Sequence, residues 1–123
     1  FFHYSDSNYM NDMWSFNYST LKWTEVKTTG DIPENRSNCT LNYDAISGRI
    51  IVFGGGGPNK KRFNTIHSLD WETKEWAEVK PKEESNIPIE RTYHTAELKS
   101  NYLIVFGGEG HWDIDDLWIF DFA

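Results

Sequence analysis

The amino-acid sequence predicts an all-β fold built from repeated antiparallel sheets, and three observations lead to this prediction. Residues 11–57 align with residues 64–110, so the chain repeats itself with a period of about 50 residues. Each copy contains a continuous apolar run, Ile50–Phe53 or Leu103–Phe106, and a glycine pair follows each run. Such short runs are typical of strands that are buried on both faces. Aromatic residues make up 16% of the chain, which suits extensive packed faces.

Four sequence pieces mark the repeat, and through them the chain resembles the kelch-repeat family over nearly its whole length. The matching pieces are Asn64–Asp70, Trp76, Arg91–Ala96 and Ile104–Gly108. The resemblance implies an all-β kelch β-propeller, of which this chain holds about two and a half four-stranded antiparallel blades. Two departures stand out. Cys39 replaces His94 in the earlier copy, and Phe2-His3 stand where a still earlier copy would carry its glycine pair.

The repeat also places the strands along the chain. One blade is complete between Arg36 and Val79, and the chain divides into segments 1–35, 36–90 and 91–123. The strands of the complete blade are expected near Asn38–Tyr43, Arg49–Phe53, Thr65–Asp70 and Glu75–Val79. The last two strands of the preceding blade are expected near Asp12–Asn17 and Lys22–Val26. The first three strands of the following blade are expected near Tyr93–Leu98, Tyr102–Phe106 and Leu117–Phe120.

The glycine pairs and the repeated tryptophans are expected to have structural roles. Glycine adopts positive φ and lets another chain approach closely, so each pair should end a strand beneath a neighbouring blade's aromatic or arginine side chain. These residues are Gly54, Gly55, Gly107 and Gly108. A phosphate-binding loop is the alternative for the first pair, but its Lys-Ser/Thr ending is missing. Trp23 and Trp76 should open the outermost strand and fill the gap between blades, with ligand stacking as the alternative.

A four-stranded meander fixes the side on which each loop emerges. The loop after the second strand and the link after the fourth leave on the same face, which here carries the longer segments. These segments are Phe2–Met10, Lys27–Arg36, Gly54–Phe63, Lys80–Arg91 and Gly107–Ile114. The opposite face carries short turns such as Asp44–Gly48. Long loops on a rigid scaffold are the usual place for binding residues, so the long-loop face is the predicted binding face.

Two groups of residues on this face are candidates for partner binding. Lys60, Lys61 and Arg62 form a basic cluster that suits a carboxylate-rich or phosphorylated partner, although a solvated loop tip is an equal alternative. His111 and Trp112 place an aromatic ring in a loop, and tryptophan is common at binding hot spots. The alternative for Trp112 is that its ring folds back onto the scaffold.

Arg36 and Arg91 are a third pair of candidates because each follows a proline by three residues and begins an inner strand. One interpretation directs them to the mouth of the central channel, where they would bind an anionic group. The other interpretation, which the family resemblance suggests, is structural packing. The sequence leaves these two roles open.

The sequence contains no recognisable catalytic, metal-binding or cofactor-binding pattern. The histidines fall at unrelated repeat positions without metal-ligand spacing. They are His3, His67, His94 and His111. Cys39 lies on an expected inner strand, where a buried small hydrophobic role is favoured over a nucleophile. The sequence therefore predicts neither an enzyme nor a cofactor.

Composition restricts the classes of partner. The formal net charge is −7, which disfavours a nucleic acid or an anionic membrane surface as the main partner. The lone cysteine suits a reducing compartment, the cytoplasm or the nucleus. The expected function, by analogy with the fold, is a non-catalytic protein-binding module that serves as a scaffold or recruits a substrate. The alternative is the targeting domain of a larger enzyme, such as a phosphatase or a ubiquitin-ligase adaptor. The remaining blades are expected from the same longer chain or from self-association.

Overall fold

The structure is a computed structural model that describes residues 9–123. These residues form ten strands and no helix, which confirms the predicted all-β class. The strands are β1 (Trp14–Asn17), β2 (Lys22–Glu25), β3 (Thr29–Gly30), β4 (Thr40–Asp44), β5 (Arg49–Phe53), β6 (Ile66–Asp70), β7 (Glu75–Val79), β8 (Thr95–Lys99), β9 (Tyr102–Glu109) and β10 (Asp113–Asp121). The expected departure at Phe2-His3, and His3 itself, lie outside the described residues.

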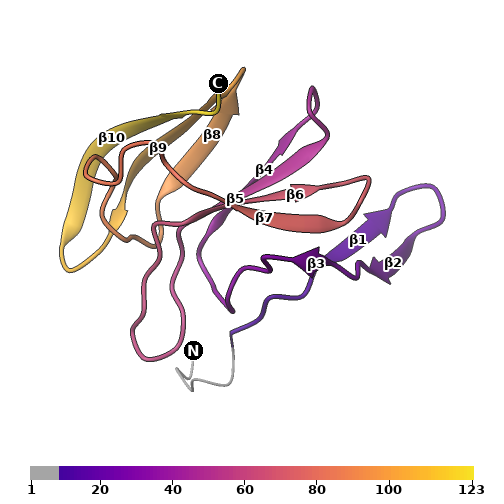
Figure 1. Ribbon diagram of the computed structural model, residues 1–123. Helices are drawn as coiled ribbons and strands as arrows, with labels where there is room; N and C mark the ends of the chain where they lie inside the picture. Colours follow the sequence, from indigo (N-terminus) through magenta and orange to yellow (C-terminus); the bar gives the residue numbers. More distant parts are fainter. Residues whose placement is uncertain (1–8) are drawn as a thin grey trace.

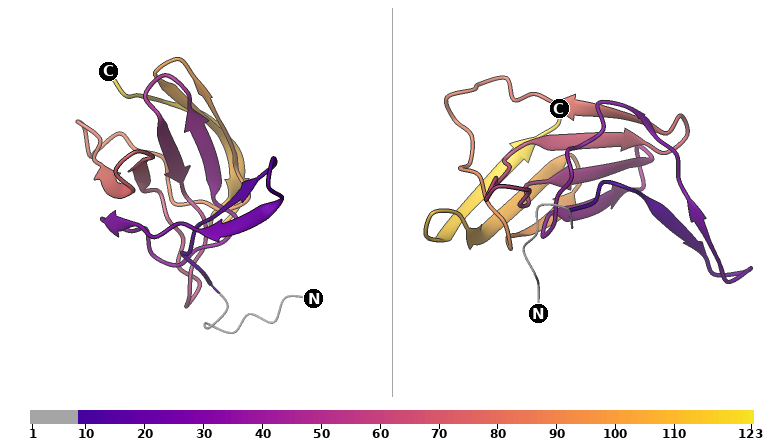
Figure 2. Two further views of the ribbon diagram at one scale, coloured as in Figure 1. Left: turned by 90° about the vertical axis from the view of Figure 1, so that its right-hand side faces the viewer. Right: turned by 90° about the horizontal axis from the view of Figure 1, so that it is seen from below.

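The strands form three sheets that lie side by side (Figure 1). The N-terminal hairpin is β1–β2, the central sheet has the order β3-β7-β6-β5-β4, and the C-terminal sheet has the order β10-β9-β8. Every pairing is antiparallel except that of β3 with β7. Figure 2 shows the central sheet between the other two. The chain thus holds one whole blade flanked by two partial ones.

The pairing registers show that the repeat seen in the sequence is also a repeat in space. Phe53 pairs with Ile66 between β5 and β6, and the equivalent residue Phe106 pairs with Leu117 between β9 and β10. At the outer strand, Trp76 pairs with Leu69. In the N-terminal hairpin, Trp23 pairs with Phe16 in the same way. Trp23 and Trp76 therefore occupy equivalent backbone positions in successive blades.

The core lies between the sheets and covers both faces of the central one. Alternate side chains of β5 point to opposite faces, so each face contributes to a different cluster. The cluster facing the C-terminal sheet contains Ile51, Phe53, Ile66, Leu103 and Val105. The cluster facing the N-terminal hairpin contains Val52, Leu69 and Trp76, with Met13 and Ile50 packed against it. This two-sided burial explains why β5 is continuously apolar.

A short strand that the sequence did not predict covers the outer edge of the central sheet. β3 lies within the segment expected to be a loop, and it runs parallel to β7. The Trp76 indole nitrogen donates a hydrogen bond to Thr28 Oγ1 at 3.1 Å. Gly30 has φ of 81°, and a Cβ there would come within 2.3 Å of the Trp76 carbonyl oxygen. Only glycine therefore allows this close approach.

The second glycine pair corrects one sequence-based expectation. Gly54 and Gly55 follow the last residue of β5, as expected, but β9 continues through Gly107 and Gly108 to Glu109. Both pairs have positive φ. In the C-terminal sheet the register shifts between Ile114 and Leu117, so the glycines sit at a β-bulge and the ladder resumes beyond it. The expected loop Gly107–Ile114 is therefore a hairpin with a three-residue tip, 110–112.

Candidate protein-binding face

The longer loops gather at one edge of the sheets, as the meander predicts. In Figure 1 the loop after β5 projects at the lower edge, near the start of the described chain, whereas the β4–β5 and β8–β9 turns lie at the upper edge. Backbone bonds hold this loop in a defined shape, because Phe63 N donates to Gly55 O and Gly57 N donates to Lys61 O, at 2.9 and 2.8 Å. The basic cluster is thus carried on a folded loop.

Five of the seven predicted partner-binding residues border one hollow on this face. The hollow has a volume of about 420 Å³ and lies between the loop after β5 and the tip of the β9–β10 hairpin. These five residues are Lys60, Lys61, Arg62, His111 and Trp112. Asn64, Ile89 and Glu90 complete the lining. We call this hollow the basic–aromatic groove. Two loops from successive repeats build it, so it exists only in the folded protein.

The three cations of the groove differ in how their charges are compensated. Lys61 Nζ lies 2.8 Å from Glu34, and Arg62 Nη2 lies 3.4 Å from Glu109. Lys60 makes no ion pair with any of residues 9–123. Both ion pairs are solvent-exposed and therefore weak. A partner's anion can reach Lys60 directly and can compete for the other two cations.

The aromatic part of the groove stays open to solvent. Trp112 is 62% exposed, and its ring centroid lies 6.3 Å from that of His111. Gly110 N donates to Trp112 O at 2.9 Å and closes the hairpin tip that presents the ring. The indole therefore does not fold back onto the sheets, which was the alternative to an exposed aromatic. An exposed tryptophan on a rigid tip is the kind of residue that anchors protein interfaces.

Arg36 and Arg91 lie inside the scaffold rather than at an open channel mouth. Arg91 is completely buried. Its guanidinium donates to the carbonyl oxygens of Ile89 and Gly107 and forms a bidentate pair with Asp116, at 2.5 and 2.9 Å. The hydrogen bond from Arg91 holds the pKa of Asp116 below its usual range. A partner cannot reach Arg91 in this structure, and the geometry is that of the packing role.

Arg36 repeats these contacts in the central blade, with one substitution. Its guanidinium donates to the carbonyl oxygens of Glu34 and Gly54, at 3.0 and 3.1 Å, which correspond to Ile89 and Gly107. Thr65 Oγ1 takes the place of the Asp116 carboxylate, at 3.3 Å. The guanidinium also stacks 4.0 Å from the Phe63 ring centroid. Arg36 is only partly buried, and desolvation lowers its pKa. It too serves mainly to fix the loop after β5.

Cys39 and His94 occupy equivalent positions of the repeat, and both side chains lie at contacts between blades. His94 is buried, packs edge-on against Phe53 at 5.1 Å and shares a hydrogen bond with Thr40 Oγ1 at 3.1 Å. Burial, aided by the nearby charge of Arg91, lowers the pKa of His94 to about 4. Burial raises the pKa of the Cys39 thiol. Both side chains are therefore uncharged parts of the packing at neutral pH.

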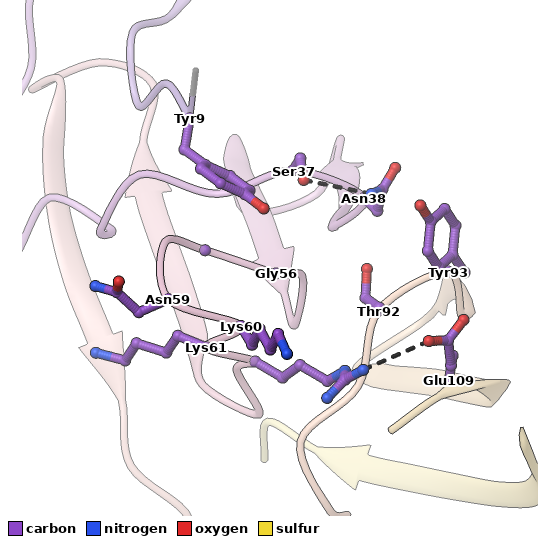
Figure 3. Close-up of a pocket in the computed structure, with 12 residues that line it drawn as sticks. Tyr9, Ser37, Asn38, Gly56, Asn59, Lys60, Lys61, Thr92, Tyr93 and Glu109 are labelled. Carbon is purple, nitrogen blue, oxygen red and sulfur yellow. Dashed lines mark hydrogen bonds and ion pairs between the residues drawn. The ribbon is translucent and has the colours of Figure 1, made fainter. Parts of the chain in front are cut away.

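A second hollow on the same face was not predicted from the sequence. It has a volume of about 540 Å³ and includes side chains from three successive repeats (Figure 3). Its lining includes residues that were not among the predicted partner-binding residues, such as Tyr9, Asn38, Thr92, Tyr93 and Glu109. Lys60 and Arg62 border it from the loop after β5, so this loop separates the two hollows. We call it the inter-repeat pocket.

Metal sites and membrane-spanning helices are two further kinds of feature. Within residues 9–123, no group of three or more His, Cys, Asp or Glu side chains is arranged to hold a metal ion. The same stretch contains no helix with the length and apolar content to cross a bilayer.

Comparison with known proteins settles the family. Residues 3–123 match the model of the KLHDC2/KLHL20/DRC7 Kelch-repeats domain. The chain belongs to the kelch-repeat family. The resemblance drawn from the glycine pairs and the repeated tryptophans is thereby confirmed, together with the partial-propeller architecture.

The relatives to which the chain is similar have names that refer to different functions. The chain is 30% identical over 103 residues to dynein regulatory complex subunit 7 of Chlamydomonas reinhardtii, covering 84% of this chain and 9% of that protein. It is 32% identical over 99 residues to an N-(sulfonatooxy)prop-2-enimidothioate sulfolyase of Thlaspi arvense, covering 80% and 28%. It is 30% identical over 117 residues to human (Homo sapiens) kelch domain-containing protein 10, covering 89% and 26%. The chain thus spans less than a third of each of these relatives.

Proposed function

We propose that this kelch segment is a non-catalytic protein-recognition module that binds its partner through the long-loop face. The observation that carries the proposal is the basic–aromatic groove, in which Lys60 and the exposed Trp112 come from different repeats yet border one hollow. An open indole supplies a hydrophobic anchor, and adjacent cations attract acidic segments and raise the association rate. On a chain of net charge −7, such a local basic surface selects a partner segment of opposite charge.

The same groove would serve a scaffold or the targeting part of a larger enzyme. The relatives include a subunit of a dynein regulatory complex and a sulfolyase, so kelch repeats occur both in assemblies and in an enzyme. We favour recognition for this chain because the groove offers an anchor and charges. A targeting role is the second candidate, and the short share of each relative that the chain spans is consistent with it.

Affinity capture with matched variants tests the proposed face. Trp112→Ala removes the anchor, and the triple variant Lys60→Glu, Lys61→Glu, Arg62→Glu reverses the basic cluster. The matched control is Ile46→Ala, because Ile46 is 90% exposed on a short turn of the opposite face. We expect Trp112→Ala to weaken partner capture by about tenfold, the effect of a typical hot spot of roughly 1–2 kcal/mol.

The triple variant should lose capture at least as strongly, and Ile46→Ala should retain wild-type capture. Circular dichroism of each variant checks that the β-structure is intact, since all of these side chains are at the surface. Unchanged capture by both groove variants, or a loss confined to Ile46→Ala, would refute the proposed face.

A further inference from the structure

Two equivalent residues of the repeat line the inter-repeat pocket and share an unusual backbone conformation. Asn38 and Tyr93 are equivalent in the repeat, and both have left-handed backbone conformations with φ of 53° and 58°. Asparagine tolerates this conformation, whereas a bulky aromatic residue adopts it at a cost. Tyr93 N donates to Asn38 O at 3.3 Å, so the two residues are held together. Strained residues of this kind concentrate at binding sites.

The Tyr93 side chain is largely exposed at the pocket. It is 59% exposed, and Figure 3 shows its ring standing at one wall of the pocket with Asn38 beside it. Tyr9 lies at the far wall, on a segment from the preceding blade (Figure 3). Two accessible tyrosine rings thus flank a hollow that is large enough for a side chain and its neighbouring backbone.

Cationic groups reach the same pocket from the loop after β5. Arg62 and Lys60 border it, and the dashed line that ends on Glu109 in Figure 3 is the ion pair with Arg62. At 3.4 Å this pair is long, and both side chains are accessible to water, so it contributes little to stability. Glu109 therefore occupies, loosely, the place beside Arg62 that an external anion would take.

A buried hydroxyl group completes the set of donors. Thr92 lies between Gly56 and Glu109 in the lining, and its side-chain oxygen has no hydrogen-bond partner although it is buried. Figure 3 shows the hydroxyl turned towards the side of the pocket that Asn38 and Tyr93 form. An unpaired buried hydroxyl is unfavourable, and a bound acceptor would satisfy it.

We propose that the inter-repeat pocket receives a phosphorylated serine or threonine side chain of the protein partner, with Glu109 as an internal competitor for Arg62. The inference rests on the proposed function and adds the chemical class of the bound segment. A phosphate monoester carries nearly two negative charges and three acceptor oxygens. Those oxygens match three donors, Arg62, Lys60 and Thr92, that approach from different residues. A carboxylate carries a single charge, so it would compensate less of the positive charge of Arg62 and Lys60.

The test uses a peptide array with phosphoserine at a fixed position and random flanking residues. The same array carries unphosphorylated serine and glutamate at that position. We expect binding to phosphoserine peptides at least tenfold tighter than to either other form, and competition by millimolar inorganic phosphate. Equal binding of the three forms, or tighter binding to glutamate, would overturn the proposal.

Variants at Glu109 and Thr92 separate the pocket from the groove, because these two residues line only the pocket. Glu109→Gln removes the competitor and should tighten phosphopeptide binding several-fold, whereas Arg62→Gln should weaken it at least tenfold. The nearly isosteric Thr92→Val should weaken binding several-fold. The charge-matched control Lys99→Gln should have little effect, because Lys99 is exposed beside the β8–β9 turn on the opposite face and does not line the pocket. Weaker binding by Glu109→Gln would contradict the competitor role.

Phosphatase treatment distinguishes failure of this inference from failure of the proposed function. If a partner captured in a Trp112-dependent way is still retained after its phosphates are removed, the binding face stands and the phosphate pocket is wrong. If capture is lost both on phosphatase treatment and in Arg62→Gln, both proposals hold. If no variant on this face alters capture, both proposals fail.

Discussion

The central and C-terminal sheets have the same strand register but very different burial. Phe53 and Phe106 are equivalent residues at the ends of equivalent apolar runs, and yet they are 2% and 52% exposed. Phe53 packs against the C-terminal sheet, whereas no sheet of residues 9–123 covers the face that carries Phe106, Leu117 and Ile119. Burial here is therefore a property of neighbouring blades, because each blade is too thin to bury its own faces.

The N-terminal side shows the same difference. Trp76 is 6% exposed because β3 and the segment before β1 cover it, whereas the equivalent Trp23 is 66% exposed. Trp23 contacts Phe16 at a ring-centroid distance of 5.1 Å, and no second sheet packs over it among the described residues. Among the described residues, Trp76 therefore fills a gap between blades as expected, whereas Trp23 does not.

The largest expected effect comes from truncating the two equivalent phenylalanines. Phe53→Ala leaves a cavity between two sheets and should lower the free energy of unfolding by about 3–5 kcal/mol. Phe106→Ala removes a half-exposed ring and should cost about 1 kcal/mol or less in this 123-residue chain. Urea denaturation of both variants, followed by tryptophan fluorescence, measures the difference. Equal losses would show that the two faces are covered alike.

The two equivalent arginines give the next largest difference. Arg91→Leu removes a buried guanidinium, breaks its pair with the partly exposed Asp116 and leaves two carbonyl groups without donors, which should cost about 2–4 kcal/mol. Arg36→Leu breaks hydrogen bonds to uncharged acceptors only, at a partly exposed site, and should cost about 1–2 kcal/mol. Thermal denaturation of the two variants tests the order. A larger loss for Arg36→Leu would contradict the role assigned to Asp116.

A smaller effect, which depends on pH, should distinguish His94 from its equivalent Cys39. The pKa of His94 is about 4 in the folded protein, below the ordinary value of 6.5, because its neutral form is buried. The stability contribution is therefore complete above pH 6.5 and is lost as the pH falls from 6.5 towards 4. We expect a loss of up to about 3 kcal/mol over this range. Cys39 stays uncharged throughout it.

Denaturation of the wild type and of His94→Gln at pH 7 and pH 4.5 isolates this contribution. The variant is expected to be less stable than the wild type at pH 7, but its stability should change less between the two pH values. Burial also lowers the pKa of His67. Because His67 is present in both proteins, subtracting the two pH dependences removes its contribution. An identical pH dependence in both proteins would mean that His94 is already protonated, or exposed, in the folded state.

Most of the fold could be predicted because the residues that define the sequence repeat are also the residues that pack in the core. The observed bounds of β5 and β7 agree with the expected strands, since apolar runs and a tryptophan mark them. β3 could not be foreseen, because its two residues have no apolar pattern and gain their place from the edge of β7. The extension of β9 through the glycine pair was also missed, since glycines allow both a strand end and a bulge.

The candidate site was predictable only in part, for a similar reason. The basic cluster and Trp112 were visible as unusual side chains in long loops, and the structure brings them to one groove. The inter-repeat pocket depends on how three repeats meet and on backbone conformation. Nothing in the residue types of Asn38, Tyr93 or Glu109 indicates that they share a pocket, because the positive φ values arise from the packed fold.

Hydrogen–deuterium exchange of the chain with and without its captured partner tests the central claim that the long-loop face binds. The account predicts that partner binding slows exchange in segments 58–62 and 110–112, while turns 44–48 and 71–74 on the opposite face exchange at unchanged rates. Protection of those two turns, with no change at the loop after β5 or at the β9–β10 tip, would contradict it.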